Sequence, residues 1–189
     1  MAFAELNEAE WLSSDDPDVL LGYIAPRLTR RQGALFACAC CRRLWCLVTD
    51  ERWRRVVQVR ERQAGGEDVA VEIGAVYDWY LAEARAGRFR MWPPLIPFVH
   101  LASPGFGDPL WLWHTAKMAR QGAGGAASLM ARGAGAGRGE QEAAKKAAKQ
   151  SEAAAQCAIL REIVGNPFQA APLTEQRQAE PGAAADGGA

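Results

Sequence analysis

Hydrophobic side chains recur every three or four residues over much of this chain, the spacing that gathers them on one side of an α-helix. The clearest stripe begins after Asp68 and ends near Gly87, a residue suited to closing a helix. Its members are Val69, Ile73, Val76, Tyr77, Tyr80, Leu81 and Ala84. The pattern predicts an all-α protein.

Polar residues mark where the first helices should begin. Asn7 with Glu10, and Thr29 with Gln32, have the spacing of a capping box. Asp16 precedes Pro17 as a helix cap precedes a first-turn proline, and Asp50 should cap a helix over residues 51–63. Between these signals, residues 34–48 form the most hydrophobic segment, too long for a strand. We predict that this segment is the central helix of a small bundle, and it carries most of the cysteines.

The second half of the chain changes character. Five prolines between residues 88 and 109 predict an irregular, tryptophan-rich segment, followed by a short helix over 110–120. The predicted organisation is a helical bundle over 1–87, a Pro/Trp-rich segment with the short helix over 88–121, a Gly/Ala linker over 122–139, a long C-terminal helix over 140–168 that packs on the bundle, and a disordered tail over 169–189.

Charge is balanced overall but unevenly distributed. The chain has 22 basic and 22 acidic residues, so as a whole it offers no net field to attract nucleic acid or a membrane. Residues 1–26 hold six acidic residues and no basic one, whereas residues 27–62 hold ten arginines against three acidic residues. Either the two stretches neutralise each other in the fold, or the basic stretch faces a partner.

The N-terminus and the cysteines indicate a compartment. The first residues are acidic where a secretory signal needs basic ones, and the longest apolar run, Leu95 to Leu101, is far shorter than the roughly 20 residues that span a bilayer. Five cysteines is an odd number, and three of them crowd together at 38, 40 and 41, which is unlike a disulfide framework. These features predict a cytoplasmic protein with reduced thiols that does not bind membranes.

Two segments resemble a family of uncharacterised proteins expanded in planctomycete bacteria. The first is LFACACCRRLW at 35–45, followed by TDER at 49–52 and preceded by an acidic EAEWL at 8–12; the second is an alanine-rich helix that closes on GNPF at 165–168. The resemblance covers about residues 5–65 and 150–168, and the proline-rich middle departs from it. It implies no activity, but it implies that the helical segments at both ends belong to one unit.

The cysteine cluster is the first candidate site. On a helix, Cys38 and Cys41 lie three residues apart on one face, so a metal site would use this pair with two further ligands from Cys157, His100 or His114. The alternative is that the cysteines are small hydrophobic residues in a tight helix crossing. A redox motif would place its reactive thiol at a helix N-terminus, whereas Cys38 and Cys41 lie well inside. The packing interpretation is favoured.

The arginines and tryptophans are the other candidates. Arg54, Arg55 and Arg62, with Arg42, Arg43 and Arg52, could form a basic surface for nucleic acid. They could instead form a solvated face paired with the acidic N-terminus and with Asp50, Glu51 and Glu61. The second interpretation is favoured because no helix-turn-helix signature accompanies them. Trp92, Trp111 and Trp113 could fill the core or anchor a partner, and the core-filling interpretation is favoured.

Catalytic groups are scarce, since the chain has only two histidines and their spacing supports no triad. We therefore expect a non-enzymatic protein-interaction module without a cofactor, whose interaction residues are drawn from the arginines and tryptophans named above. The alternatives are a nucleic-acid-associated protein that uses the arginine face and, ranked last, a thiol- or metal-binding protein that uses Cys38 and Cys41.

Overall fold

The computed structural model describes residues 6–87, 93–103 and 109–169, and within these ranges the chain forms eight α-helices and no strand. The prediction of an all-α fold is therefore confirmed. The helices are α1 (Glu8–Ser13), α2 (Pro17–Ile24), α3 (Arg30–Arg43), α4 (Glu51–Ala64), α5 (Ala70–Arg85), α6 (Ile96–Ala102), α7 (Pro109–Gly133) and α8 (Arg138–Val164). Short 3-10 turns lie at Ala25–Arg27, Trp45–Leu47 and Pro93–Leu95.

The predicted caps begin the first four helices. Asn7 and Thr29 each make a complete capping box, Asp16 caps α2 ahead of Pro17, and Asp50 accepts a hydrogen bond from the backbone of Arg52. Each cap satisfies a backbone N–H that the helix itself leaves unpaired.

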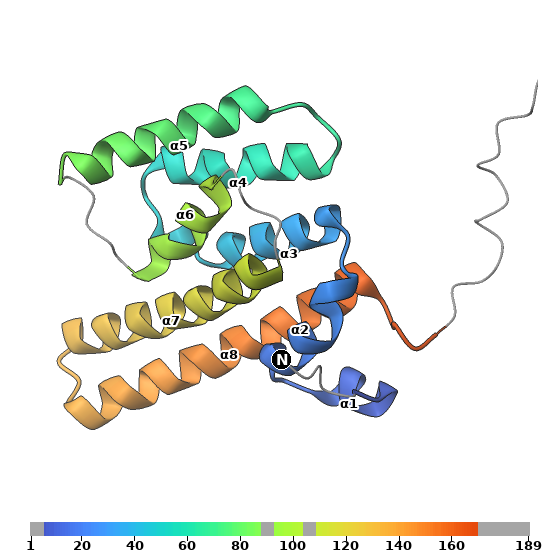
Figure 1. The fold of residues 1–189 in the computed structure, drawn as a ribbon. Coiled ribbons are helices and arrows are strands. Elements are labelled where there is room, and N and C mark those ends of the chain that lie inside the picture. The colour runs from blue at the N-terminus through green and yellow to red at the C-terminus, as the bar shows by residue number, and fades with distance from the viewer. Residues whose placement is uncertain (1–5, 88–92, 104–108, 170–189) are drawn as a thin grey trace, which may run out of the picture.

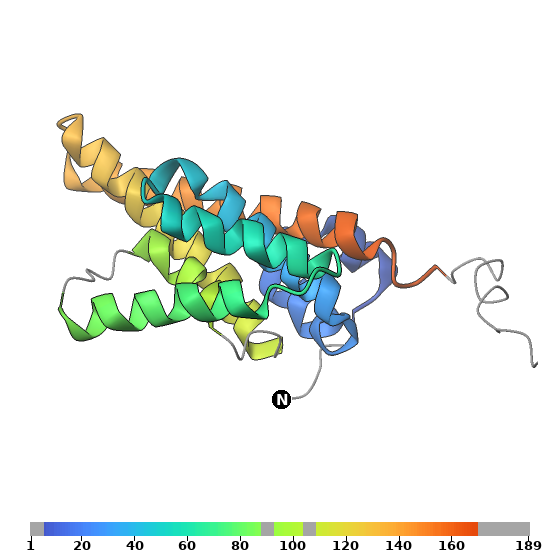
Figure 2. The ribbon, with the colours of Figure 1, turned by 90° about the horizontal axis from the view of Figure 1, so that it is seen from above.

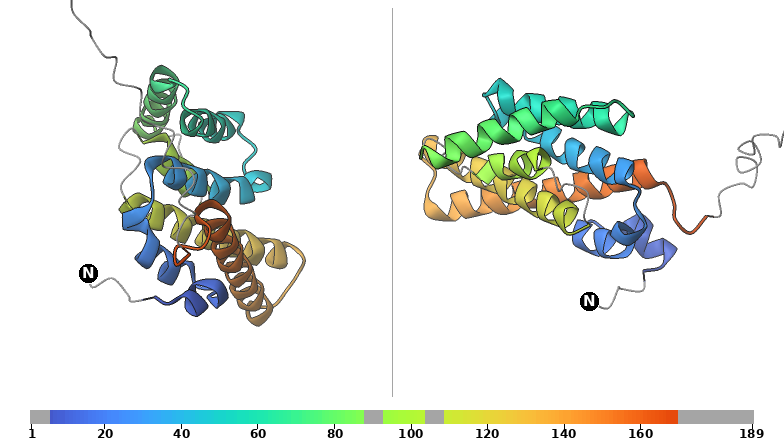
Figure 3. Two further views of the ribbon diagram at one scale, coloured as in Figure 1. Left: turned by 90° about the vertical axis from the view of Figure 1, so that its right-hand side faces the viewer. Right: turned by 45° about the horizontal axis from the view of Figure 1, so that its top comes forward.

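The helices stack in layers around α3 (Figures 1 and 3). On one side of α3 lies the antiparallel α7–α8 hairpin, and on the other lie α4 and α5, side by side in Figure 2. The short α6 contacts α3, α4 and α7. Phe36, Ala37 and Cys40 of α3 are fully buried, as expected for the central helix of the bundle.

Helix α3 ends earlier than predicted. It stops at Arg43, five residues short of Val48, and a 3-10 turn follows. The turn lets Leu44 and Val48 both enter the core while the chain reverses toward α4, and it leaves Cys46 exposed. An uninterrupted helix would have carried the chain past α4.

The predicted linker over residues 122–139 is wrong. Residues 122–133 continue α7, and after a turn at Gly135, where φ is +84°, α8 begins at Arg138. Two of the glycines are packing positions, because a Cβ on Gly122 would lie 2.8 Å from Cα of Pro94 and one on Gly124 would lie 2.8 Å from Cγ of Lys149. Alanine supplies helix propensity between them, so small residues here allow close helix packing.

The Pro/Trp-rich segment is more regular than predicted where the structure describes it. Helix α6 follows the Pro93–Leu95 turn, with Pro97 in its first turn where its missing N–H costs nothing. It buries Phe98 and Leu101. The short helix predicted over 110–120 is the first half of α7.

The two ends of the described chain lie in contact, through residues of α1, α2 and α8 and the residues that follow these helices. Arg161 donates hydrogen bonds to the backbone carbonyls of Trp11 and Ser14, and Phe168 stacks on Tyr23 at 5.3 Å between ring centroids. Helix α8 also contacts α3 and α7. A disordered tail is predicted over residues 169–189, and all of it beyond Gln169 lies outside the described residues. No helix in the described ranges is long and apolar enough to cross a bilayer.

Candidate functional site

The predicted arginine face lies on α3 and α4, and each of its six arginines pairs with a carboxylate. The ion pairs are Arg42–Glu61 (2.6 Å), Arg43–Glu152 (2.7 Å), Arg52–Asp50 (2.7 Å), Arg54–Glu51 (2.6 Å), Arg55–Glu72 (2.9 Å) and Arg62 with both Glu67 (2.7 Å) and Glu72 (2.8 Å). Arg62 and Arg55 hold the pKa of Glu72 below its ordinary value, and Arg52 does the same for Asp50. Six guanidinium groups thus meet six carboxylates, and the local charge cancels.

These carboxylates are not those of the acidic N-terminal stretch. They come from residues 50–72 and from α8, whereas Asp18 pairs with Arg120 of α7 and Glu8 accepts from Asn166. The hypothesis that residues 1–26 neutralise residues 27–62 therefore does not hold for the recorded pairs. Asp50, Glu51 and Glu61, also expected as partners, are confirmed.

Arg54 is a structural residue as well as a surface one. Its guanidinium donates to the backbone carbonyls of Val48 (2.8 Å) and Trp45 (3.4 Å), which fixes the turn between α3 and α4. Arg55 and Arg52 are more accessible, with side chains 63% and 57% exposed. A partner would reach these two guanidinium groups first.

Two tryptophans that the sequence did not single out lie beneath the arginines. The guanidinium of Arg42 sits 4.1 Å from the ring centroid of Trp45, and that of Arg52 sits 4.2 Å from the ring centroid of Trp79. Such stacking is a cation–π interaction. The signal for Trp45 was its place three residues after Arg42, but nothing local linked Trp79 of α5 to Arg52 of α4.

A groove runs between α4 and α5 beside Trp79. It encloses about 310 Å³, and we name it the α4–α5 groove. Its lining residues are Arg52, Arg55, Glu72, Ala75, Val76 and Trp79. The half-buried indole rests edge-on against the buried Trp53, at 5.0 Å between centroids, so one wall of the groove is rigid and aromatic.

Helix α5 leaves much of its predicted stripe half-buried. Ile73 is its buried residue, Tyr77 and Tyr80 are partly accessible, and Ala84 is exposed. The helix contacts α4 and α6 at the outer edge of the stack. Within the described residues, the other side of this aromatic-rich helix is open to contact with another molecule.

The predicted tryptophans of the middle segment lie elsewhere. Trp111 and Trp113 lie on α7. The ring centroids of Trp111 and of His100 in α6 are 5.0 Å apart, and the ammonium of Lys117 lies 5.2 Å from the ring centroid of Trp113. Both tryptophans are half-buried. Burial, with a smaller contribution from His114, lowers the pKa of His100 to about 4. Trp92 lies outside the described residues.

The cysteine candidates face the core. Cys38 and Cys41 are buried, and the Cys38 thiol contacts the backbone carbonyl of Val57 at 3.8 Å. Burial raises the pKa of Cys38 to about 12 and that of Cys157 to about 11, and it also raises the pKa values of Cys40 and Cys41 well above the ordinary value of a thiol. Among the described residues, no three His, Cys, Asp or Glu side chains gather as metal ligands. Cys38 and Cys41 thus pack as small hydrophobic residues.

Thiol accessibility gives a direct prediction. No disulfide links the five cysteines, and only Cys46 among them is exposed. We expect one thiol per chain to react rapidly with Ellman's reagent in the native protein, and five after denaturation, because the reactive species is an accessible thiolate. A Cys46→Ser variant should show none of the rapid reaction. Two or more fast thiols would contradict the buried placement of the cluster.

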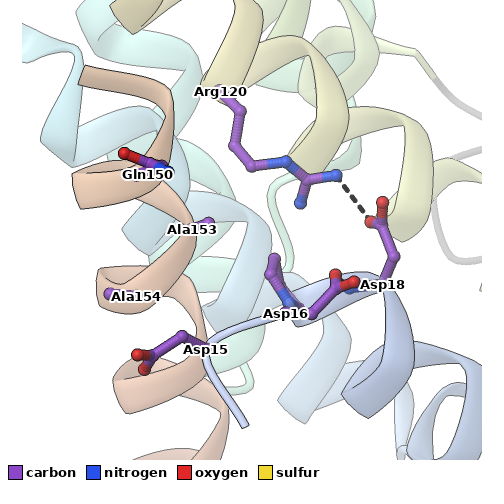
Figure 4. A pocket seen from close by; sticks show the side chains of 8 residues that line it. Asp15, Asp16, Asp18, Arg120, Gln150, Ala153 and Ala154 are labelled. Carbon is purple, nitrogen blue, oxygen red and sulfur yellow. Dashed lines mark hydrogen bonds and ion pairs between the residues drawn. The ribbon is translucent and has the colours of Figure 1, made fainter. Parts of the chain in front are cut away.

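A second hollow of about 520 Å³ lies between α2, α7 and α8 (Figure 4). Asp15, Asp16 and Asp18 line one side, and Arg120 reaches across from α7 to donate to Asp18 at 2.6 Å. Behind it, Gln156 accepts from Arg120 and donates to Glu152, which binds Arg43. Asp18 and Arg120 link α2 to α7, Gln156 links Arg120 to α8, and Asp16 caps α2. These contacts hold three helices together, so we assign the hollow a chiefly structural role.

Fold and surface together define an all-α bundle with a charge-balanced, tryptophan-bearing outer layer. The chain gives no significant match to any protein-family description, curated protein or solved structure.

Proposed function

We propose that this protein is a non-enzymatic interaction module that binds a partner protein in the α4–α5 groove. The observation that carries the proposal is the half-buried Trp79 lining a hollow whose rim holds the accessible Arg52 and Arg55. Tryptophan and arginine are the side chains most enriched among residues that dominate binding energy at protein interfaces. The groove offers such an anchor on a rigid wall.

Charge supports a protein partner over nucleic acid. A nucleic-acid surface gains most of its affinity from uncompensated Lys and Arg that meet phosphates. The six arginines of the predicted face already meet carboxylates, so phosphates that bind the accessible Arg52 and Arg55 would have to displace Asp50 or Glu72. A mixed polar and aromatic protein surface requires no such exchange.

Affinity capture from the native host, with nuclease present, tests this function. We expect a stoichiometric protein partner with the wild type, and at least a tenfold reduced yield with Trp79→Ala or Arg55→Glu. Removal of a central anchor commonly costs about 2 kcal/mol or more, equivalent to roughly 30-fold in affinity. Arg55 is preferable to Arg54 as a probe, because Arg54 also holds the α3–α4 turn.

Arg132→Glu is the matched control, because Arg132 is exposed near the end of α7, on a different element from the groove. Circular dichroism should show that all variants remain folded. Undiminished capture by both groove variants would reject the groove as the binding site. Recovery of nucleic acid without nuclease, and of nothing with it, would instead favour the arginine-based alternative.

The relationship to the planctomycete family is likewise a proposal, and it rests on the segments at 8–12, 35–52 and 165–168. These segments lie within one packed unit, since Phe168 stacks on Tyr23 and Asn166 donates to Glu8. The contact between the two ends supports the implication that the N-terminal and C-terminal segments belong to one structural unit.

A further inference from the structure

The two histidines of the chain lie together although 14 positions separate them in sequence. His100 on α6 and His114 on α7 have ring centroids 5.9 Å apart, with an angle of 51° between the ring planes. His114 is exposed and His100 is partly so. The pair therefore opens to solvent on a face built by two helices that pack against each other.

The surroundings of His100 select one tautomer. Thr115 is fully buried, and its hydroxyl donates to the backbone carbonyl of Trp111 at 2.8 Å. The same oxygen lies 3.5 Å from Nδ1 of His100. Because the single hydroxyl proton is already used, this long contact is favourable only in the tautomer in which Nδ1 carries the hydrogen and donates to the oxygen. The lone pair of His100 is then on Nε2, and Thr115 plays the supporting part that orients metal-binding imidazoles in other proteins.

The separation of the rings suits a shared ion. With metal–nitrogen bonds of about 2.0 Å, an ion in line with a ring nitrogen lies roughly 3.2 Å from the ring centroid. When the nitrogen–metal–nitrogen angle is tetrahedral, the centroids of two such rings lie about 5.2 Å apart. When the two nitrogens lie on opposite sides of the ion, the centroids lie about 6.4 Å apart. The observed 5.9 Å falls between these limits. The centroid separation is therefore compatible with one ion shared by a nitrogen of each imidazole.

We propose that His100 and His114 bind one divalent transition-metal ion, with water completing the coordination. Imidazole nitrogen prefers zinc, nickel and copper over magnesium or calcium. Two protein ligands make an open, exchangeable site rather than a structural one. The inference is independent of the function proposed for the α4–α5 groove.

Titration with Ni²⁺ tests the site, using untagged protein in a Cys46→Ser background so that the exposed thiol does not compete. Calorimetry should give one ion per chain, and binding should quench tryptophan fluorescence because Trp111 contacts His100. His100→Gln and His114→Gln should each weaken binding at least tenfold, and the double variant should lose both the heat and the quenching.

The same titration contains the outcomes that overturn the proposal. Equal affinity and quenching in the double variant would place the ion elsewhere. One ion per two chains would place it between molecules. A single variant that binds like the parent would show that only one imidazole is a ligand. Circular dichroism of each variant distinguishes loss of the ligand from loss of the fold.

Discussion

Replacing Arg60 with methionine should lower the free energy of unfolding by about 3 kcal/mol, the largest effect we expect from any single charged residue of α4. Arg60 is only 4% exposed. Its guanidinium donates to the backbone carbonyls of Leu101 and Ser103, both at 2.6 Å, and to the side chain of Gln63 at 2.7 Å. Burial accordingly lowers the pKa of Arg60.

The carbonyl partners explain the size of the effect. Leu101 belongs to the last turn of α6, where carbonyl groups have no partner within the helix. A cation at the C-terminus of a helix satisfies these groups and interacts favourably with the helix dipole. Methionine preserves the aliphatic bulk but leaves the carbonyls of Leu101 and Ser103 without this donor. The end of α6 should then fray.

Chemical denaturation of Arg60→Met measures the loss, and Arg85→Met is the control because Arg85 is exposed at the end of α5. For a chain of this length the expected loss corresponds to a fall in melting temperature of about 6 to 12 °C. Arg60→Lys should recover only part of it, because one ammonium cannot reproduce the planar fork that reaches both carbonyls. A loss below about 1 kcal/mol in the methionine variant would contradict this account.

Arg60 also shows which features of a buried charge can be predicted from the sequence and which cannot. Its position in the apolar sector of residues 51–63 was visible from helical spacing, and so was its need for a polar partner. From the sequence, a charged side chain in that sector is expected to reach solvent or find a carboxylate. Arg60 instead donates to the backbone carbonyls of Leu101 in α6 and of Ser103 just after it. Helix α6 lies in the segment that the prolines indicated to be irregular. Which carbonyls lie nearby is a property of packing, and periodicity carries no information about it.

The helix starts were predictable because their causes are local. Asn7, Asp16, Thr29 and Asp50 act on backbone groups within three residues. The continuation of α7 through residues 122–133 was not predictable in this way, because glycine is a poor helix former in isolation. Its presence there depends on close approach of Pro94 and of α8, distant in sequence.

The candidate site likewise has one part that depends on local contacts and one part that depends on tertiary packing. The pairing of Arg52 with Asp50 and of Arg54 with Glu51 involves neighbours on one helix turn, and the favoured hypothesis of a solvated, paired face anticipated it. The α4–α5 groove depends on how α5 docks against α4, so Trp79 received no weight from the sequence. Exposed groups brought together by tertiary packing are invisible to spacing rules.

Two glycines of α7 should respond oppositely to the same substitution. We expect Gly122→Ala to destabilise the protein by about 1 to 2 kcal/mol and Gly125→Ala to stabilise it by about 0.5 to 1 kcal/mol. A Cβ on Gly122 would lie 2.8 Å from Cα and 3.2 Å from N of Pro94, so the backbone of the Pro93–Leu95 turn would have to move. A Cβ on Gly125 would meet no atom within 4 Å.

The opposite signs follow from two competing terms. Alanine favours the helix over glycine by up to about 1 kcal/mol at either position, and overpacking costs about 1 to 3 kcal/mol at Gly122 alone. Because both residues lie on one helix three positions apart, differences in the unfolded chain largely cancel between the variants. In thermal and urea denaturation, the free energies of unfolding of the two variants should therefore differ by about 1.5 to 3 kcal/mol. Equal and small effects would instead indicate that residues 122–133 form the linker that their composition suggests.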